Sequence, residues 1–154
     1  ESAPGVHVLV RGYVKLTRCS PDGRELVMSL AGPGDLFGPC CDPFAASPAS
    51  CTAVTVSAVR MMVMPAPAWR SLSMTSAAIV RAFVSLMMTS RRGCTELAPR
   101  LAFLSVEQRL AALLRSLTRW SDPTVKPVEL PALMTHSEMA QALGTAREVV
   151  TRCL

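Results

Sequence analysis

The residues with the clearest potential for chemistry lie near the end of the chain, where Arg147, Glu148, Thr151 and Arg152 recur at helical spacing. Because each helical residue turns the next side chain by about 100°, these residues would all lie within roughly 140° of Arg147. Arginine can donate two hydrogen bonds to guanine, and glutamate can accept one from cytosine, so this face has the groups needed to read a DNA major groove. The same pattern also fits an ordinary solvent-exposed face with mixed charges. The intervening apolar residues would form the opposite face: Val149, Val150 and Cys153.

Two pairs of threonine and glutamate predict the helices that would position this face. Thr135 with Glu138, and Thr145 with Glu148, each fit a capping box. In that motif the hydroxyl accepts from the backbone N–H three residues later, and the carboxylate accepts from the N–H of the capping residue. Two helix starts this close together leave room for one short helix and a turn.

The residues between the two predicted caps favour a tight turn. Gly144 lies just before the second cap, where a sharp connection needs a residue that tolerates positive φ. Ala140 is small enough for the second helix to cross close to the first, and Val150 would fill the angle between them. Together these features predict a DNA-binding helix-turn-helix.

Composition sets limits on the rest of the molecule. The chain has 154 residues, of which 50% are hydrophobic and 18% charged, enough for a core in one or two small domains. Its net charge of +5 suits a polyanionic partner without requiring one. The sequence shows no signal peptide and no uncharged run of the roughly 18 to 20 residues that span a bilayer, so we expect a cytoplasmic location and no membrane partner. The six irregularly spaced cysteines do not suggest a disulfide framework.

The first sixty-odd residues have the pattern of β-structure. Short apolar runs are separated by turn residues at Gly12, at 21–23 and at 32–35, which predicts short strands forming a roll or barrel. The segment 51–64 continues this pattern with β-branched residues, and Pro65 ends it. The stretch from Pro39 to Pro48 is predicted to be a loop.

From Met74 to Leu97 the apolar spacing becomes helical, and Pro99 is expected to end the helix. A helix of this length can pack on the roll and also meet a second copy of itself in a coiled coil. The alternative is a helix buried wholly within one chain. The residues predicted for a dimer interface are Ile79, Phe83, Leu86 and Met87.

The segment after this helix is expected to connect it to the helix-turn-helix. Residues 100–104 are predicted to form a short joint that passes a shift of the long helix to the DNA-binding helices. Ser105 and Gln108 then begin another capped helix, rich in leucine, that would seat the helix-turn-helix. The proline-containing stretch 121–131 is predicted to be a linker with room for a short strand at 128–130.

This order of parts resembles the Crp/Fnr superfamily, the bacterial catabolite activator and fumarate-nitrate regulator transcription factors. The resemblance rests most on four motifs, which are Val10–Lys15, Pro33–Gly38, Leu101–Leu104 and Thr145–Arg152. It implies an α+β fold with a partial β-roll for effector sensing in residues 1–73, a dimerisation helix in 74–99 and a winged helix-turn-helix in 100–154. It also implies that the chain begins inside the roll and stops inside the recognition helix, before the wing.

The resemblance implies a homodimeric transcriptional regulator that reads a palindromic operator in double-stranded DNA, with RNA polymerase as a further partner. The family's base contacts carry over to Arg147, Glu148 and Arg152, and its phosphate contacts to Thr135 and His136. Thr151 shares the face of the base-contacting residues.

The effector pocket departs from the cyclic-AMP binders of the family. Those proteins carry Gly-Glu-Leu for the ribose and Arg-Ser or Arg-Thr for the cyclic phosphate, whereas the corresponding positions here are 38–40, Gly-Pro-Cys, and 49–50, Ala-Ser. Without the arginine a buried phosphate has no bidentate counterion, so we expect an unknown small-molecule or redox effector rather than cyclic AMP. The candidate pocket residues are Gly38, Cys40, Cys41, Ser50, Cys51 and Cys94.

The cysteines near this pocket permit two interpretations. Thiolates ligate soft metals and oxidise reversibly, which fits a redox or metal sensor. However, there is no Cys-x-x-Cys, and cysteine is also a common small hydrophobe of protein cores, so the sequence predicts no metal site and identifies no cofactor.

Two other classes of function remain to be weighed. A sensor or interaction module without DNA binding would have no need of Arg147, Glu148 and Arg152 on one helix face. An enzyme would need a nucleophile with a base, a phosphate-binding loop or metal-ligand spacing, and the sequence shows none of these. The predicted function is therefore a DNA-binding regulator.

Overall fold

The computed structural model describes residues 5–37, 51–118 and 134–154, except for the side chains of 91–94. The predicted loop at 39–48, with Gly38, Cys40, Cys41 and Ser50, lies outside the described residues. So do the predicted linker at 121–131 and the side chain of Cys94.

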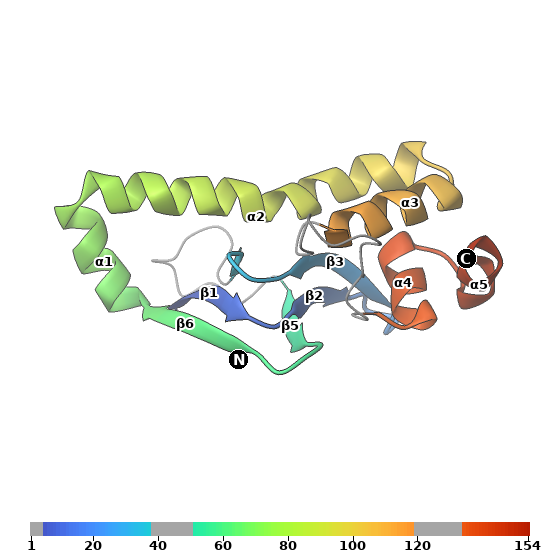
Figure 1. The fold of residues 1–154 in the computed structure, drawn as a ribbon, viewed down its shortest axis with the longest axis horizontal. Helices are drawn as coiled ribbons and strands as arrows, with labels where there is room; N and C mark the ends of the chain where they lie inside the picture. Colours follow the sequence, from blue (N-terminus) through green and yellow to red (C-terminus); the bar gives the residue numbers. More distant parts are fainter. Residues whose placement is uncertain (1–4, 38–50, 119–133) are drawn as a thin grey trace.

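Within the described residues, six strands form two small antiparallel sheets, in agreement with the predicted α+β fold (Figure 1). The first sheet has the order β4-β1-β6 and the second β3-β2-β5. We call these two sheets together the roll. Their strands are β1 (Gly5–Arg11), β2 (Val14–Cys19), β3 (Glu25–Ala31), β4 (Leu36–Phe37), β5 (Thr52–Thr55) and β6 (Arg60–Pro65).

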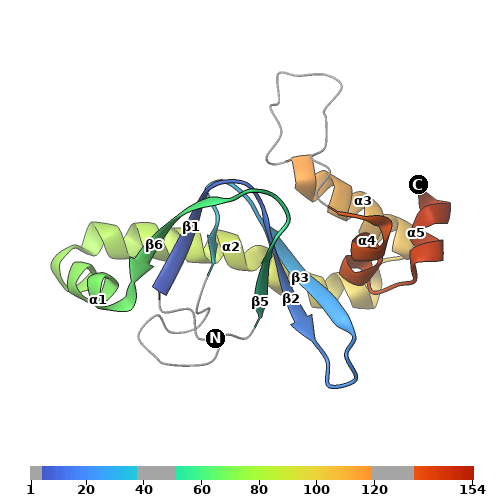
Figure 2. The ribbon, with the colours of Figure 1, turned by 90° about the horizontal axis from the view of Figure 1, so that it is seen from below.

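The core of the roll lies between the two sheets. Leu9 of β1 and Phe37 of β4 pack against Val14 of β2 and Ala31 of β3, and all four are buried. Gly12 connects β1 to β2 with φ of 85°, and a Cβ there would collide with the carbonyl oxygen of Ala58. Figure 2 shows how the strands curve around this core, with the long helix passing along the roll.

The helical part begins with α1 (Ala66–Thr75) and α2 (Ala77–Phe103). Sequence periodicity predicted one helix from Met74, but the chain breaks at Ser76, whose side chain caps α2 by accepting from the N–H of Ile79. Trp69 of α1 is buried, and its ring packs on Phe83 of α2 with centroids 3.9 Å apart. The break lets α1 fold back so that the two rings meet.

The prediction that α2 ends before Pro99 was wrong. A proline inside a helix removes one backbone hydrogen bond and costs about 3 kcal/mol, yet α2 continues through Pro99 to Phe103. An ion pair between Glu96 and Arg100 spans the proline, and the N–H of Leu104 donates to the carbonyl of Arg100. The predicted joint at 100–104 is therefore helical up to 103, and only Leu104 and Ser105 connect α2 to α3.

The remaining helices of the described residues are α3 (Val106–Leu117), α4 (His136–Leu143) and α5 (Arg147–Cys153). The predicted cap of α3 is confirmed, since Ser105 Oγ accepts from the N–H of Gln108 and the Gln108 side chain accepts from the N–H of Ser105. None of the helices in the described part of the chain combines the length and hydropathy needed to cross a bilayer.

Candidate nucleic-acid interface

The first helix of the predicted helix-turn-helix begins where the sequence indicated. Thr135 Oγ1 accepts from the N–H of Glu138 at 3.2 Å, and the Glu138 carboxylate accepts from the N–H of Thr135 at 2.9 Å. This capping box fixes the start of α4 at His136.

The second predicted capping box, Thr145 with Glu148, does not form. The first helical residue of α5 is Arg147, and its N-cap is Ala146, without a side-chain capping bond. The reason lies in the end of α4. Gly144 adopts the left-handed conformation, and the N–H groups of Gly144 and Thr145 both donate to the carbonyl of Ala140. Thr145 therefore belongs to the C-terminal motif of α4, which moves the start of α5 one residue along.

The two helices cross on a small apolar core. Val150 of α5 is 0% exposed and packs with Ala140 and Leu143 of α4 and Leu110 of α3. This packing agrees with the expectation that Ala140 allows the helices to cross closely and that Val150 fills the angle between them. Half-buried Leu113, Leu114, Met139 and Cys153 extend this cluster.

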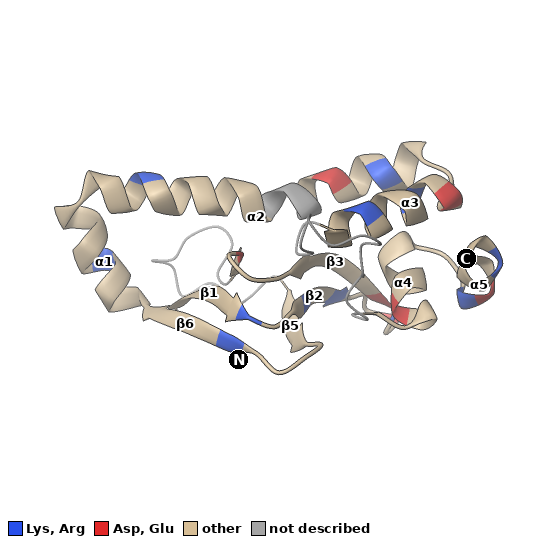
Figure 3. Ribbon diagram, in the orientation of Figure 1, with Lys and Arg blue, Asp and Glu red and all other residues tan. Residues whose placement is uncertain are grey.

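We call the exposed side chains of Arg147, Glu148, Thr151 and Arg152 the recognition face. All four are exposed, whereas Val149 and Cys153 are half-buried. Figure 3 shows both signs of charge on α5 at the end of the molecule farthest from α1. The separation of polar and apolar faces agrees with the helical periodicity. The side chains of the recognition face are accessible to a binding partner.

One side-chain contact joins the recognition face to α4. Thr151 Oγ1 donates to the carbonyl of Arg147 at 3.1 Å and lies 3.2 Å from His136 Nδ1. Because the hydroxyl proton of Thr151 is used in the first bond, the second assigns the donor proton to His136 Nδ1. His136, the first residue of α4, thus forms a hydrogen bond with a side chain of α5.

Arg109 of α3 is a contributor that sequence reasoning missed. Its guanidinium donates to the carbonyl of Leu143 at the C-terminal end of α4, where a positive charge also complements the helix dipole. The same end of the guanidinium lies near Gly144, since a Cβ on that glycine would be 3.6 Å from Nη1. The two partners are far apart in the sequence, and no local motif identifies the pair.

The sequence also missed a contact between α4 and the roll. Glu138 pairs with Lys15 of β2, with Nζ and Oε1 2.7 Å apart. The hydrogen bond from Lys15, followed by those from Thr135, holds the pKa of Glu138 below its usual range. The helix-turn-helix is therefore docked on the roll through a charged pair.

Most of the candidate effector residues lie outside the described part of the chain. Of the six, only Cys51 is described with its side chain, half-buried just before β5. Among the described residues, no three His, Cys, Asp or Glu side chains are grouped so that they could hold a metal ion.

The four residues predicted for a dimer interface lie in different environments along α2. Phe83 packs on Trp69 of its own chain, and Ile79 and Met87 are half-buried. Leu86 is exposed, as are neighbouring Val84 and Met88. The helix thus carries apolar surface on more than one side, as its length led us to expect.

Two parts of the chain match the models of known domain families. The family model of the cyclic nucleotide-binding domain matches residues 1–76, and that of the Crp-like helix-turn-helix domain matches residues 108–154. The CRP-like cAMP-activated global transcriptional regulator of Mycobacterium tuberculosis is 29% identical over 157 residues, covering 100% of this chain and 70% of that protein. The cAMP-activated global transcriptional regulator CRP of Salmonella typhimurium is 25% identical, covering 100% of this chain and 73% of that protein.

Solved structures show the same fold. FixK2 from Bradyrhizobium japonicum superposes with a TM-score of 0.83 at 19% identity, covering 99% of this chain and 74% of that one. The c-di-GMP responsive global regulator CLP from Xanthomonas campestris superposes with a TM-score of 0.77 at 24% identity, covering 100% of this chain and 77% of that one.

Proposed function

The chain belongs to the Crp/Fnr superfamily of bacterial transcription factors, and we propose that it reads its DNA operator through the recognition face of α5. It is a DNA-binding transcriptional regulator, and its relatives are regulators rather than enzymes. The observation that carries the proposal is an exposed set of Arg, Glu, Thr and Arg on a helix whose other face is anchored by buried Val150.

Each residue of the recognition face has a role that follows from its chemistry. Arg147 and Arg152 each present a planar guanidinium that can bind guanine O6 and N7, and Glu148 can accept from cytosine N4. The Thr151 hydroxyl already donates within α5, so it has no proton left for a base acceptor, and its methyl group is free to contact thymine.

Two residues at the start of α4 are proposed to face the DNA backbone. His136 uses its Nδ1 proton for Thr151, so Nε2 would donate to a phosphate oxygen when the imidazole carries a proton on both nitrogens. The Thr135 hydroxyl already bonds both the N–H and the carboxylate of Glu138. We therefore expect Thr135 to act mainly as the cap that orients His136, with phosphate contact as its secondary role.

We propose that two copies associate along α2 and read a palindromic operator. A dimeric reader of this kind needs its two recognition helices about 34 Å apart, one turn of B-DNA. The residues proposed for the interface remain Ile79, Phe83, Leu86 and Met87, with exposed Val84 and Met88 extending the apolar surface. RNA polymerase is proposed as a further partner, and the cytoplasm as the location.

The proposed effector is a small molecule or redox signal other than cyclic AMP. The relatives from M. tuberculosis and S. typhimurium are named as cAMP-activated. This chain, however, has no lysine or arginine between Gly38 and Thr52, the stretch that corresponds to the phosphate-binding arginine of the family's cyclic-AMP binders. A redox signal sensed through the cysteines near this stretch would need no anion-binding group.

The proposal is tested by selecting palindromic sites from a random pool with the full-length protein at fixed salt, with and without cyclic AMP. Arg147→Ala should lose about 1–3 kcal/mol of discrimination at one base pair and little non-specific affinity. Arg81→Ala, at an exposed arginine on α2, is the matched control and should leave both unchanged.

Three outcomes would contradict parts of the proposal. Specific binding that Arg147→Ala does not alter would remove α5 as the reader. Specific binding that appears only with cyclic AMP would show that the effector assignment is wrong. Selection of single half-sites rather than palindromes would contradict the dimer.

A further inference from the structure

The ion pair between Lys15 and Glu138 joins two parts of the chain that sequence reasoning treated separately. Lys15 lies on β2 of the roll and Glu138 on α4 of the helix-turn-helix, 123 positions apart. Their side chains are only 11% and 25% exposed. A contact this well covered is different from a surface ion pair, which contributes little.

The face of β2 that carries Lys15 shows why the pair matters. Side chains alternate along a strand, so Val14 and Leu16 point to the core of the roll while Lys15 and Thr17 point outward. Both outward residues are nevertheless buried. Both α4 and α2 contact the neighbouring strand β3, so helices cover this outer face, and α4 supplies the carboxylate that meets Lys15. A covered ammonium group is unfavourable without a counterion, so docking requires Glu138.

Glu138 serves two structures at once. Its Oε2 accepts from the N–H and the hydroxyl of Thr135, which completes the cap of α4, while Oε1 accepts from Lys15. The carboxylate is therefore held rigidly by its own helix, and the direction of α4 is tied to the position of Lys15.

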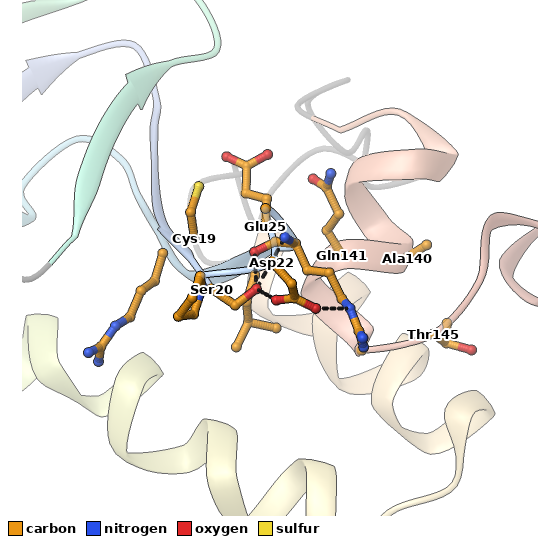
Figure 4. Close-up of a pocket in the computed structure, with 13 residues that line it drawn as sticks. Cys19, Ser20, Asp22, Glu25, Ala140, Gln141 and Thr145 are labelled. Atoms are coloured by element: carbon orange, nitrogen blue, oxygen red, sulfur yellow. Dashed lines mark hydrogen bonds and ion pairs between the residues drawn. The ribbon is translucent and has the colours of Figure 1, made fainter.

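The rest of the boundary is loosely packed. A cleft separates the tip of the β2–β3 hairpin from α4 and the turn after it (Figure 4). Asp22 at the hairpin tip pairs with Arg24 of the same hairpin instead of with the helix, and Gln141 and Thr145 line the other side. Among the described residues, the ion pair and the α4–β3 packing are the contacts that hold this side of the helix-turn-helix on the roll.

We propose that Lys15 is a positioning residue for the DNA reader and that the Lys15–Glu138 pair, which we call the latch, sets how α4 is docked on the roll. The inference rests on the proposed function, because it assigns the latch a role in placing the recognition face. A shift of β2 in the roll moves α4 directly, without passing through α2. An equilibrium between docked and undocked states then depends on whether the latch is closed.

The latch is tested with two variants that keep the local structure. Glu138→Gln removes the charge but retains a side chain that completes a capping box, and Lys15→Met keeps an unbranched apolar stem. Arg18→Met, at an exposed arginine of the same strand, is the control. Hydrogen exchange of the full-length protein would be measured for the amides of β2, β3 and α4, with circular dichroism confirming that each variant is folded.

Each single variant should speed exchange at the boundary of β3 and α4 by about tenfold, the loss expected for a hydrogen bond to a charged group. The Arg18→Met control should exchange like the wild type. The double variant should exchange no faster than the worse single variant, because one interaction can be lost only once. Unchanged exchange in both single variants, or effects that multiply in the double variant, would overturn the latch.

A second readout separates the latch from the function on which it rests. Lys15→Met should shift the preferred spacing of half-sites or weaken specific DNA affinity, while Arg147→Ala should leave hydrogen exchange at the boundary unchanged. Altered exchange without any specific DNA binding by the wild type would keep the latch and reject the proposed function. Specific DNA binding by the wild type, together with unchanged exchange in the variants, would keep the proposed function and reject the latch.

Discussion

Replacing Gly144 by alanine tests how the turn of the helix-turn-helix is built. Gly144 has φ of 60° and ψ of 46°, in the left-handed region, where a residue with a Cβ costs about 1–2 kcal/mol. The added Cβ would lie 3.0 Å from Leu101 Cδ2, which is tighter than ordinary contact. Because that atom ends a flexible, half-buried side chain, it can move by a few tenths of an ångström. We therefore expect Gly144→Ala to cost about 1–2 kcal/mol, mostly from the backbone.

The assay is hydrogen exchange of the amides in α4 and α5, which reports the free energy of opening this unit. A cost of about 1–2 kcal/mol corresponds to a roughly five- to thirty-fold loss of protection. The same substitution made in a Leu101→Ala background separates the two causes, because the close contact is then absent. Protection equal to the wild type would refute the backbone argument, and a cost that disappears with Leu101→Ala would place it in the contact instead.

Two further predictions follow from buried groups. Val150→Ala should lower the free energy of unfolding of the helix-turn-helix by about 2–3 kcal/mol, since Val150 is 0% exposed. Urea denaturation checks this, with exposed Leu154→Ala expected to change less than about 0.5 kcal/mol. Acidification should open the latch. The pKa of Glu138 is held below 4.5 by Lys15 and Thr135, so its stabilisation is present above that pH and is lost as the pH falls through the lowered pKa. The urea midpoint of the wild type should therefore approach that of Glu138→Gln in acid, and a constant difference down to about pH 3 would contradict the assignment.

Local patterns predicted the parts of the fold that depend on neighbouring residues. The caps at Ser105 and Thr135 form as expected, because a capping box needs only a hydroxyl and a carboxylate or amide three positions later. Thr145 shows the limit of that reasoning. It fits the same motif, but its N–H is already engaged by the carbonyl of Ala140 at the end of α4. Two local motifs competed for one residue, and the turn at Gly144 decided between them.

Pro99 shows a local preference that the surrounding structure outweighs. Proline lowers helix stability wherever it occurs in the interior, so the sequence indicated an end to α2. α2 nevertheless continues to Phe103, and α3 begins directly after its cap at Ser105. As a result, the predicted five-residue joint is replaced by two residues, Leu104 and Ser105.

The latch could not have been found from the sequence, and the reason is physical. In isolation, Lys15 and Thr17 alternate with Val14 and Leu16, which indicates two polar side chains on the solvent side of a strand. The burial of Lys15 involves Glu138 of α4, which lies far along the chain. A polar outer face on a sensor sheet is therefore compatible both with solvent and with a docked DNA-binding helix. The burial of Lys15 identifies the second, because a lysine facing water needs no carboxylate from another part of the chain.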